Sequence, residues 1–268
     1  MIERILLTND DGVTAAGLVT LANFLKSKYE VFVVAPDNER SGVSQSITFR
    51  RPIFHKSVQV TDGVRGFAIN GYPVDCVKVA LFELCPFQPD LVVSGINHGL
   101  NVGLNVLHSG TVAGALTGVA YGIPSIALSL EAPDGQEDLD FETAVSLVWP
   151  ICQSLCSNTD LSGTVLNVNI PEAAVTTRCA DYHVVPVNCN NMGFHFEQGH
   201  DPKRRPYHWQ TNHPDPMPLS KLCDVQVIQQ GKIAISPIGN DLTRHGLVEA
   251  LAQRASPSAV TNHRALSR

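Results

Sequence analysis

Short apolar runs alternate with amphipathic segments at the start of the chain. Residues 4–8 and 30–36 are almost continuously apolar, and the first run ends in the polar turn Asn9-Asp10-Asp11-Gly12. Between the runs, apolar residues recur at the spacing of one helix face, at Leu18, Leu21, Ala22 and Leu25. Strands without polar alternation are typical of a parallel sheet covered by helices on both faces. The pattern therefore predicts an α/β fold that opens as strand, helix and parallel strand.

The same alternation continues to residue 130. It predicts a helix over 73–84, a strand over 90–94, a helix of small residues over 111–121 and a strand over 124–130. Two long polar stretches interrupt it, at 37–50 and 95–109. Polar stretches of this length are more often functional loops than spacers, so we expect the site among them.

Beyond residue 135 the pattern weakens. It predicts a helix over 141–155, strands over 164–170 and 232–236, hairpins or an arm within 180–218, and a helix over 241–252. We therefore expect an N-terminal part over 1–135 that carries the site. A C-terminal part over 136–255 completes the sheet and forms the arm, and 256–268 form a flexible tail.

Two adjacent carboxylates follow the first predicted strand. In open α/β sheets, ligands bind at the carboxyl ends of strands, near the point where the strand order switches. Asp10 and Asp11 would repel each other there unless a cation joined them, and Mg2+ prefers oxygen ligands of this kind. The alternative is an ordinary Asp-Gly turn with a helix N-cap, to which aspartate is equally suited.

Two further polar loops follow predicted strands. The first contains Arg40, which could face a phosphate, and Ser41, whose hydroxyl is a neutral oxygen donor. The second contains Asn97, whose amide oxygen can ligate a cation. It also contains Ser109, which can cap the next helix, whose free N–H groups favour a phosphate. Either loop alone could be a solvated connection. Because all three loops leave strands at one edge of a sheet, we expect them to form one site.

Composition indicates a folded and weakly acidic protein. Of 268 residues, 44% are hydrophobic and 16% charged, which suits a large α/β domain with a sizeable core. A net charge of -6 argues against a surface that coats a nucleic-acid polymer, because such surfaces are usually basic. A small anion held by a cation or a helix N-terminus remains compatible with this charge.

The seven cysteines follow no metal-binding or redox spacing, and several lie in apolar runs. We expect them to be free, buried thiols of a reducing compartment. No apolar run approaches the length of a membrane span, and no signal peptide pattern precedes the first strand. A cytoplasmic protein without a membrane partner is therefore expected. The cysteines are Cys76, Cys85, Cys152, Cys156, Cys179, Cys189 and Cys223.

Five stretches of the chain together resemble the SurE family, the survival proteins that act as metal-dependent 5'-nucleotidases. They are ILLTNDDG at 5–12, VVAPDNERSGVSQSIT at 33–48, INGYPVDCVKVAL at 69–81, PDLVVSGINHGLNVG at 89–103 and SGTVAGAL at 109–116. A weaker likeness continues through DPKRRPYHW at 201–209 and KIAISPI at 232–238. The strong matches stand in order and in register, which makes coincidence a poor explanation.

The resemblance implies a Rossmann-like, mostly parallel sheet flanked by helices, with a smaller C-terminal arm of β-hairpin and helix. That arm would serve in assembly as a homodimer or homotetramer. The resemblance also implies one divalent ion per subunit, Mg2+ or Mn2+. Its ligands would be Asp10, Asp11, Ser41 and Asn97, the set that the strand ends also indicate. The substrate phosphate would lie among Asn9, Asn101, Ser109, Gly110 and Thr111.

The activity implied by the resemblance is removal of phosphate from nucleoside 5'-monophosphates. Nucleoside 3'-monophosphates and short polyphosphate are further candidate substrates. Asp10 and Asp11 are the expected catalytic residues, and the free oxygen of Asp10 is a candidate base for the attacking water. A non-catalytic nucleotide sensor on the same fold is the alternative function, because a fold does not fix an activity.

Other chemistries match the sequence less well. A phosphatase that forms an aspartyl-phosphate needs a second aspartate two positions after the nucleophile, whereas Asp10 and Asp11 are adjacent. His98 and His108 flank the glycine-rich loop and could contact phosphate or carry a proton, although such loop histidines are commonly incidental. The C-terminal histidines lack the spacing of a zinc site.

Overall fold

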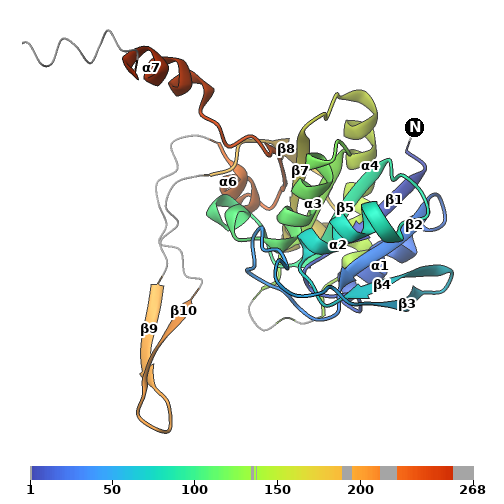
Figure 1. Ribbon diagram of the computed structural model, residues 1–268, viewed down its shortest axis with the longest axis horizontal. Helices are drawn as coiled ribbons and strands as arrows, with labels where there is room; N and C mark the ends of the chain where they lie inside the picture. Colours follow the sequence, from blue (N-terminus) through green and yellow to red (C-terminus); the bar gives the residue numbers. More distant parts are fainter. Residues whose placement is uncertain (1, 134–135, 137, 189–194, 212–221, 256–268) are drawn as a thin grey trace, which may run out of the picture.

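A nine-stranded mixed sheet forms the centre of the computed structural model, which describes residues 2–133, 136, 138–188, 195–211 and 222–255 (Figure 1). The strand order is β3-β4-β2-β1-β5-β6-β7-β11-β8. The six strands from β4 to β7 run parallel, and β3 and β11 are antiparallel to their inner neighbours. The mostly parallel Rossmann-like sheet expected from the sequence is confirmed.

The site is located by the point where the strand order reverses. From β1 (Arg4–Thr8) the chain builds the sheet in both directions, with β2 (Glu30–Pro36) on one side and β5 (Leu91–His98) on the other. The sheet then extends through β6 (Ser125–Leu130) and β7 (Thr164–Ile170). Such a switch opens a crevice at the carboxyl ends of the two diverging strands, here β1 and β5.

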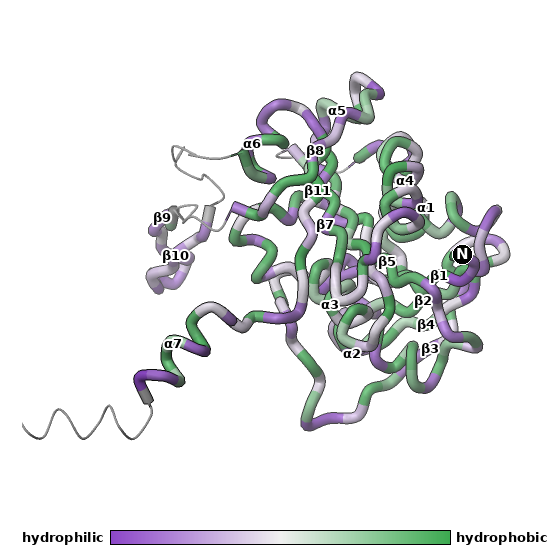
Figure 2. The backbone as a smooth tube through the Cα atoms, turned by 90° about the horizontal axis from the view of Figure 1, so that it is seen from above, coloured by the Kyte–Doolittle hydropathy of each residue, from purple (hydrophilic) through white to green (hydrophobic). Residues whose placement is uncertain are grey.

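Helices cover both faces of the sheet. Side chains alternate along β1, so that Ile5 and Leu7 pack in one cluster with α1 (Ala16–Leu25) and α4 (Phe141–Asn158). Leu6 points to the opposite face, where it packs against α2 (Pro73–Val79). The helix α3 (Gly110–Ala120) lies beside α2 on that face. Because both faces are buried, the inner strands are hydrophobic along most of their length (Figure 2).

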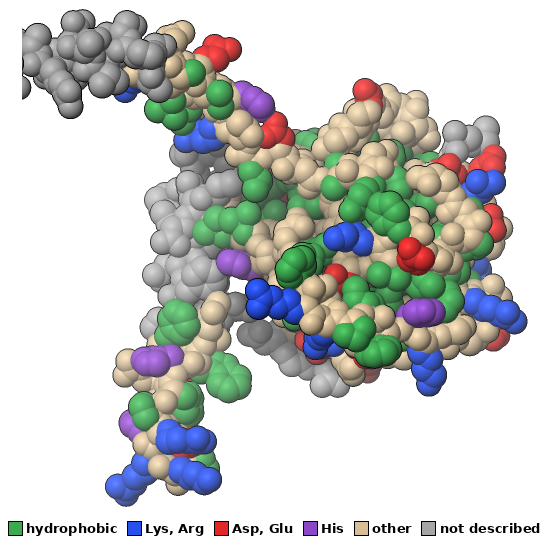
Figure 3. Space-filling view, in the orientation of Figure 1, with side chains coloured by type: hydrophobic (Ala, Val, Ile, Leu, Met, Phe, Trp, Pro, Cys, Tyr) green, Lys and Arg blue, Asp and Glu red, His purple; other side chains and the backbone are tan. Residues whose placement is uncertain are grey.

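The C-terminal half of the chain extends the same sheet and then leaves it. The strand β11 (Ile233–Gly239) pairs antiparallel with β7, and β8 (Tyr182–Val184) adds to its outer edge. A separate hairpin and the last helix, α7 (His245–Ala255), project from the body (Figure 1). The hairpin consists of β9 (His195–His200) and β10 (Pro206–Thr211). Lys and Arg side chains gather at its tip, and α7 displays hydrophobic side chains (Figure 3).

Two connections are short helices. The helix α5 (Glu172–Thr177) follows β7 directly, and α6 (Asp224–Gln229) precedes β11. No helix in the described part of the chain is long and apolar enough to cross a membrane. The boundary expected at residue 135 stays a prediction. Strands from both sides of it belong to one sheet.

Most predicted elements occur close to their predicted bounds, but the short helices α5 and α6 were not predicted, and further differences concern other segments. The segment 73–84 is α-helical only to Val79 and ends in a π-helical turn, Ala80–Leu84. The strand β5 runs on to His98, and a 3-10 turn at Gly103–Leu107 follows in what we expected to be one loop. The outermost strand β3 (His55–Thr61) and its neighbour β4 (Val64–Ile69) were not predicted, because polar and charged residues break their apolar pattern. The last helix begins four residues later than predicted, at His245 rather than at 241.

The described cysteines are free thiols, as expected, but not all are buried. Cys76, Cys152 and Cys223 are buried, Cys85 and Cys156 are partly buried, and Cys179 is exposed. Cys179 follows the end of α5 near the surface, which explains its exposure. Cys189 lies outside the described residues.

Candidate metal and phosphate site

The turn after β1 is locked by its own first residue. Asn9 is fully buried, its Nδ2 donates to the carbonyl oxygen of Gly12 at 2.9 Å, and its Oδ1 accepts from the Gly12 N–H at 3.2 Å. Gly12 has a φ of 104°, which a glycine adopts without strain. Both ends of the Asn9 amide therefore hold the turn, and a phosphate contact by Asn9 stays a prediction.

Asp10 directly follows the fully buried Asn9 after β1 and is itself buried, with 4% of its surface exposed. One carboxyl oxygen, Oδ1, accepts a hydrogen bond from the hydroxyl of Thr111 in the first turn of α3. Burial, with a smaller contribution from the neighbouring charge of Asp11, raises the pKa of Asp10 to about 6 against the lowering effect of the Thr111 bond. A carboxylate held in this way gains from a cation, which would offset both the burial and the repulsion.

Gly110 leaves the space in which the Asp10 carboxyl lies. A methyl group at Gly110 would come within 2.8 Å of both Cβ and Oδ2 of Asp10. No larger residue fits there without displacing the carboxyl, since real Cβ atoms do not approach other heavy atoms so closely. The first residue of α3 is therefore small because the acid packs against it.

Asp11 connects β1 with the end of β5. Its Oδ2 accepts the backbone N–H of His98 at 3.1 Å. Burial is the largest cause that raises the pKa of Asp11, and the nearby charge of Glu39 adds to it. Two acids with raised pKa thus stand side by side at the switch point of the sheet.

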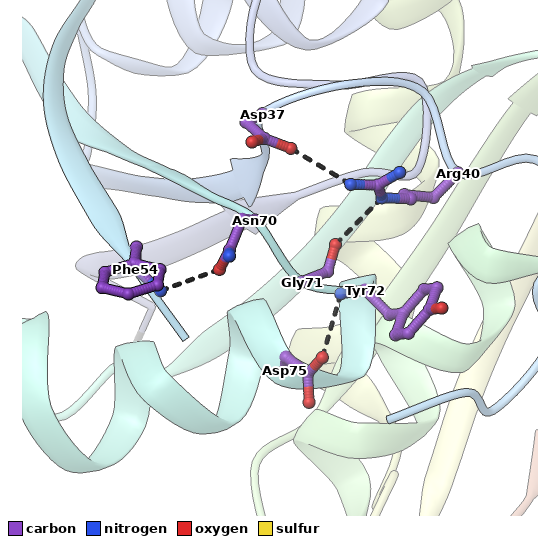
Figure 4. A network of polar contacts seen from close by, with 7 residues as sticks. All are labelled: Asp37, Arg40, Phe54, Asn70, Gly71, Tyr72 and Asp75. Atoms are coloured by element: carbon purple, nitrogen blue, oxygen red, sulfur yellow. Dashed lines mark hydrogen bonds and ion pairs between the residues drawn. The ribbon is translucent and has the colours of Figure 1, made fainter. Parts of the chain in front are cut away.

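The loop after β2 is bonded to this turn through Arg40. The backbone N–H of Arg40 donates to the carbonyl oxygen of Asp10 at 2.7 Å. Its guanidinium donates to Asp37 at 3.2 Å and to the carbonyl oxygen of Gly71 at 3.3 Å, and it lies over the ring of Tyr72 (Figure 4). These contacts hold the loop in place. They occupy the side chain of Arg40, which the sequence suggested as a phosphate contact.

Ser41 and Asn97 each stand next in sequence to a residue that bonds to this turn. Ser41 follows Arg40 in the loop after β2, and Asn97 precedes His98 at the end of β5. The Ser41 hydroxyl is exposed and donates to Glu39 at 2.7 Å rather than to either aspartate of the turn. The Nδ2 of Asn97 donates to the carbonyl oxygen of Gly99 at 2.7 Å, so its Oδ1 takes no part in that bond. The amide oxygen is the end that can ligate a cation.

The N-terminus of α3 closes the crevice beside Asp10. Ser109 caps the helix, with its Oγ accepting from the N–H of Val112 at 3.1 Å. The remaining first-turn N–H groups have no partner within the helix, and together with the helix dipole they favour an anion. Gly110 and Thr111 contact Asp10, and the role of Ser109, Gly110 and Thr111 in binding the substrate phosphate stays a prediction.

The two predicted histidines take other roles. His98 provides its backbone N–H to Asp11, and its ring Nε2 lies 3.1 Å from the carbonyl oxygen of Gln136. His108 provides its carbonyl oxygen to the N–H of Ser44 at 2.9 Å, which ties the loop after β2 to the loop before α3. Both contacts are structural.

The donors available at the crevice suit a hard divalent cation. No three His, Cys, Asp or Glu side chains gather closely enough to hold a metal within the described ranges. A cation there would need the two acids together with neutral oxygens, which Ser41 and Asn97 can supply. The partly buried, mutually repelling acids and the all-oxygen set fit Mg2+ or Mn2+ better than a softer metal.

Fold and site together define a class: α/β proteins with an acidic, oxygen-lined crevice and a helix N-terminus at the switch point of a parallel sheet. Residues 5–193 match the family model of the survival protein SurE. That match covers well over half of the chain. The chain belongs to the SurE family.

Its relatives align over nearly the whole sequence. The 5'-nucleotidase SurE of Rhodopirellula baltica is 41% identical over 250 residues, which cover 92% of this chain and 97% of that protein. The 5'-nucleotidase SurE of Syntrophomonas wolfei is 42% identical over 246 residues, 92% of each chain. The crystal structure of the SurE protein from Aquifex aeolicus superimposes with a TM-score of 0.78 at 32% identity, covering 92% of this chain and 98% of that one.

Sequence reasoning missed a group of buried polar residues behind the site. They are Ser129 on β6, Asn167 and Asn169 on β7, and Asp224 at the start of α6. Their signal was present, because two asparagines at alternate positions of an otherwise apolar strand need buried partners. Which residues serve as those partners depends on the three-dimensional fold and cannot be read from the sequence.

Proposed function

We propose that this protein is a metal-dependent phosphohydrolase that removes phosphate from nucleoside 5'-monophosphates. The observation that carries the proposal is the pairing of Asp10 with the N-terminus of α3 through Thr111. This pairing puts a cation-binding acid beside an anion-binding helix end, which is what a phosphate and its metal need. Relatives over 40% identical carry the name 5'-nucleotidase.

The proposed metal ligands are Asp10, Asp11, Ser41 and Asn97, and the ion is Mg2+ or Mn2+. A bound divalent ion supplies Lewis acidity and lowers the pKa of water. Thr111 fixes Asp10 through Oδ1, which leaves Oδ2 as the oxygen that can accept a proton from the attacking water. The first N–H group of α3, that of Gly110, with the Asn101 amide, would stabilise charge that develops on the phosphoryl oxygens.

Phosphate release tests this function. The substrates are 5'- and 3'-mononucleotides, short polyphosphate and p-nitrophenyl phosphate, each with Mg2+, Mn2+ or EDTA. We expect metal-dependent release from 5'-mononucleotides, with a loss of at least about 1000-fold in Asp11→Asn because a charged ligand of the cation is removed. The matched control is Asp62→Asn, which changes an exposed aspartate in the turn between β3 and β4.

The outcomes separate the two candidate functions. Full turnover in Asp11→Asn would refute the assignment of the site. Nucleotide binding without turnover under any metal would replace the hydrolase with a nucleotide sensor on the same fold.

We further propose that the chain assembles as a homodimer or homotetramer through its C-terminal arm. In support, α7 projects from the body with Leu247, Val248 and Leu251 each about half exposed or more. Apolar side chains gathered on one projecting element mark contact surfaces. Light scattering coupled to size exclusion should show an oligomer that Leu251→Glu weakens. A monomeric wild-type chain would refute the assembly.

A further inference from the structure

One side chain from the sheet, that of Asn169, bonds to both backbone polar groups of Asn101, and we call this pair of bonds the amide bracket. The Oδ1 of Asn169 accepts the backbone N–H of Asn101 at 2.7 Å, and its Nδ2 donates to the Asn101 carbonyl oxygen at 3.2 Å. One amide side chain thus satisfies both polar groups of a loop residue, as a neighbouring strand would. Asn169 belongs to β7, two strands away from the strand that carries the loop.

Two more buried side chains hold the same residue. Asn167 donates to the Asn101 carbonyl oxygen at 2.9 Å, and the Oγ of Ser129 accepts from the Nδ2 of Asn101 at 2.9 Å. Ser129, Asn167 and Asn169 are all fully buried. Burying three polar side chains costs free energy unless each finds a partner. Apolar packing alone therefore does not explain why these residues lie in the core of the sheet.

The contact from Ser129 also orients the side chain of Asn101. An asparagine Nδ2 carries two N–H groups, and the Ser129 hydroxyl accepts only one of them. The second N–H keeps its capacity for another acceptor, and Asn101 retains 7% exposure. A phosphate oxygen at the N-terminus of α3 is an acceptor of the right chemistry.

We propose that Asn169, supported by Asn167 and Ser129, is a positioning residue that fixes Asn101 for the substrate phosphate. The proposal rests on the proposed phosphohydrolase function. The loop around Asn101 contains Gly99 and Gly103, both with positive φ, at 113° and 56°. Glycines leave such a loop many conformations, and the amide bracket selects one of them.

A double-mutant cycle tests whether Asn169 acts through Asn101. We expect Asn169→Ala and Asn101→Ala each to lower kcat/KM by about 100-fold, the loss typical of a misplaced catalytic contact. In the double variant the loss should stay close to that of either single variant, because the same contact is lost in each case. Independent effects that multiply to about 10,000-fold would overturn the proposal.

A second pair of variants removes only a hydroxyl group from each residue, so that misfolding is less able to explain the result. Ser129→Ala should raise KM and the inhibition constant of orthophosphate about fivefold, as expected for the loss of one hydrogen bond. Ser125→Ala is its matched control, since Ser125 is equally buried on the same strand but bonds to the carbonyl oxygen of Ile123 at 2.9 Å. Equal KM and orthophosphate inhibition in the two variants would overturn the role of Ser129.

Backbone hydrogen exchange separates this proposal from the proposed function. In wild-type protein without substrate, the amides over 99–103 should exchange slowly. They should exchange at least about tenfold faster in Asn169→Ala and unchanged in Ser125→Ala, because the bracket alone differs. If no nucleotide is hydrolysed, the proposed function fails, and this measurement still decides on Asn169. Unchanged exchange over 99–103 in Asn169→Ala would overturn the proposal.

Discussion

At the scale of single residues, the site depends on the absence of a methyl group. Gly110 begins α3 directly against the carboxyl of Asp10, where a Cβ would meet heavy atoms at 2.8 Å. The glycine lets the helix N-terminus pack directly against the acid, so that the group proposed to bind phosphate lies beside the group proposed to bind the cation.

We therefore expect Gly110→Ala to abolish most activity while leaving the protein folded. The added methyl group should displace Asp10 and cost about 1–3 kcal/mol of stability through overpacking, with a loss of about 100-fold or more in kcat/KM. Nucleotidase kinetics and a thermal melt measure the two effects. Gly246→Ala is the control, because a methyl group there meets nothing within 4 Å. Wild-type kinetics in Gly110→Ala would contradict the packing argument.

The thiols differ in reactivity according to burial. Burial raises the pKa of Cys76 and Cys152 far above the usual range and that of Cys156 to about 11, whereas Cys179 is exposed. Since the thiolate is the nucleophile, iodoacetamide at pH 7.5 should modify Cys179 at least about tenfold faster than Cys76 or Cys152. Peptide mass spectrometry gives the rates, and urea-unfolded protein is the control in which the differences disappear. Equal rates in the folded protein would contradict the burial of these thiols.

At the scale of elements, α4 contains a proline, which cannot complete the hydrogen-bond pattern of a helix interior. Pro150 lies inside this 18-residue helix and is exposed. It has no N–H to donate to the preceding turn, and its ring crowds that turn's carbonyl. The buried face of α4 is contributed by its neighbours Val148, Trp149 and Cys152, so the proline itself adds little to the core.

Pro150→Ala should stabilise the protein by about 2 kcal/mol. Removing the helix penalty of about 3 kcal/mol outweighs the roughly 1 kcal/mol lost because the unfolded chain becomes more flexible. Urea denaturation measures the change. Gln153→Ala, also exposed on α4, is the matched control and should shift stability by no more than about 0.5 kcal/mol. A less stable Pro150→Ala variant would show that the proline is tied to the tertiary structure.

The elements also show what the sequence could predict. The strands β2 and β7 were predicted with the observed bounds, because inner strands buried on both faces are rich in apolar residues, although Asn167 and Asn169 interrupt the apolar run of β7. The edge strand β3 was not predicted, because only one side of it meets the core and its exposed positions carry polar residues. The outermost strands of a sheet therefore lack the signal that identifies the inner ones.

The contacts of the site can likewise be divided into those that the sequence could predict and those that it could not. The turn with Asp10 and Asp11 could be predicted to lie beside the end of β5, because neighbouring parallel strands end at one edge of the sheet, and Asp11 accepts the N–H of His98 there. The partners of Asn101 could not, since Asn169 lies 68 residues further along the chain. Contacts of this separation depend on where the fold places β7 and on nothing local to either residue.

At the scale of the whole molecule, one buried carboxylate joins the site to the C-terminal part. Asp224 is fully buried at the start of α6. Its Oδ2 accepts the N–H of Gly103 at 2.8 Å, across 121 residues of sequence, and its Oδ1 accepts the N–H of Asn188 at 2.8 Å. The loop that carries Asn101 is therefore held by Asp224, at the start of the helix that follows the hairpin in the chain.

Asp224→Ala should destabilise the protein by about 3–5 kcal/mol, because it leaves buried backbone N–H groups without their charged acceptor. Because Gly103 lies two residues after Asn101, the variant should also raise KM for 5'-mononucleotides several-fold in whatever fraction remains folded. Urea denaturation and initial-rate kinetics give the two values, with Asp181→Ala as the control, since Asp181 is exposed on the same C-terminal part. A destabilised variant with wild-type KM would show that Asp224 supports the fold without transmitting its position to the phosphate pocket. A variant as stable as the wild type would contradict the structural role itself.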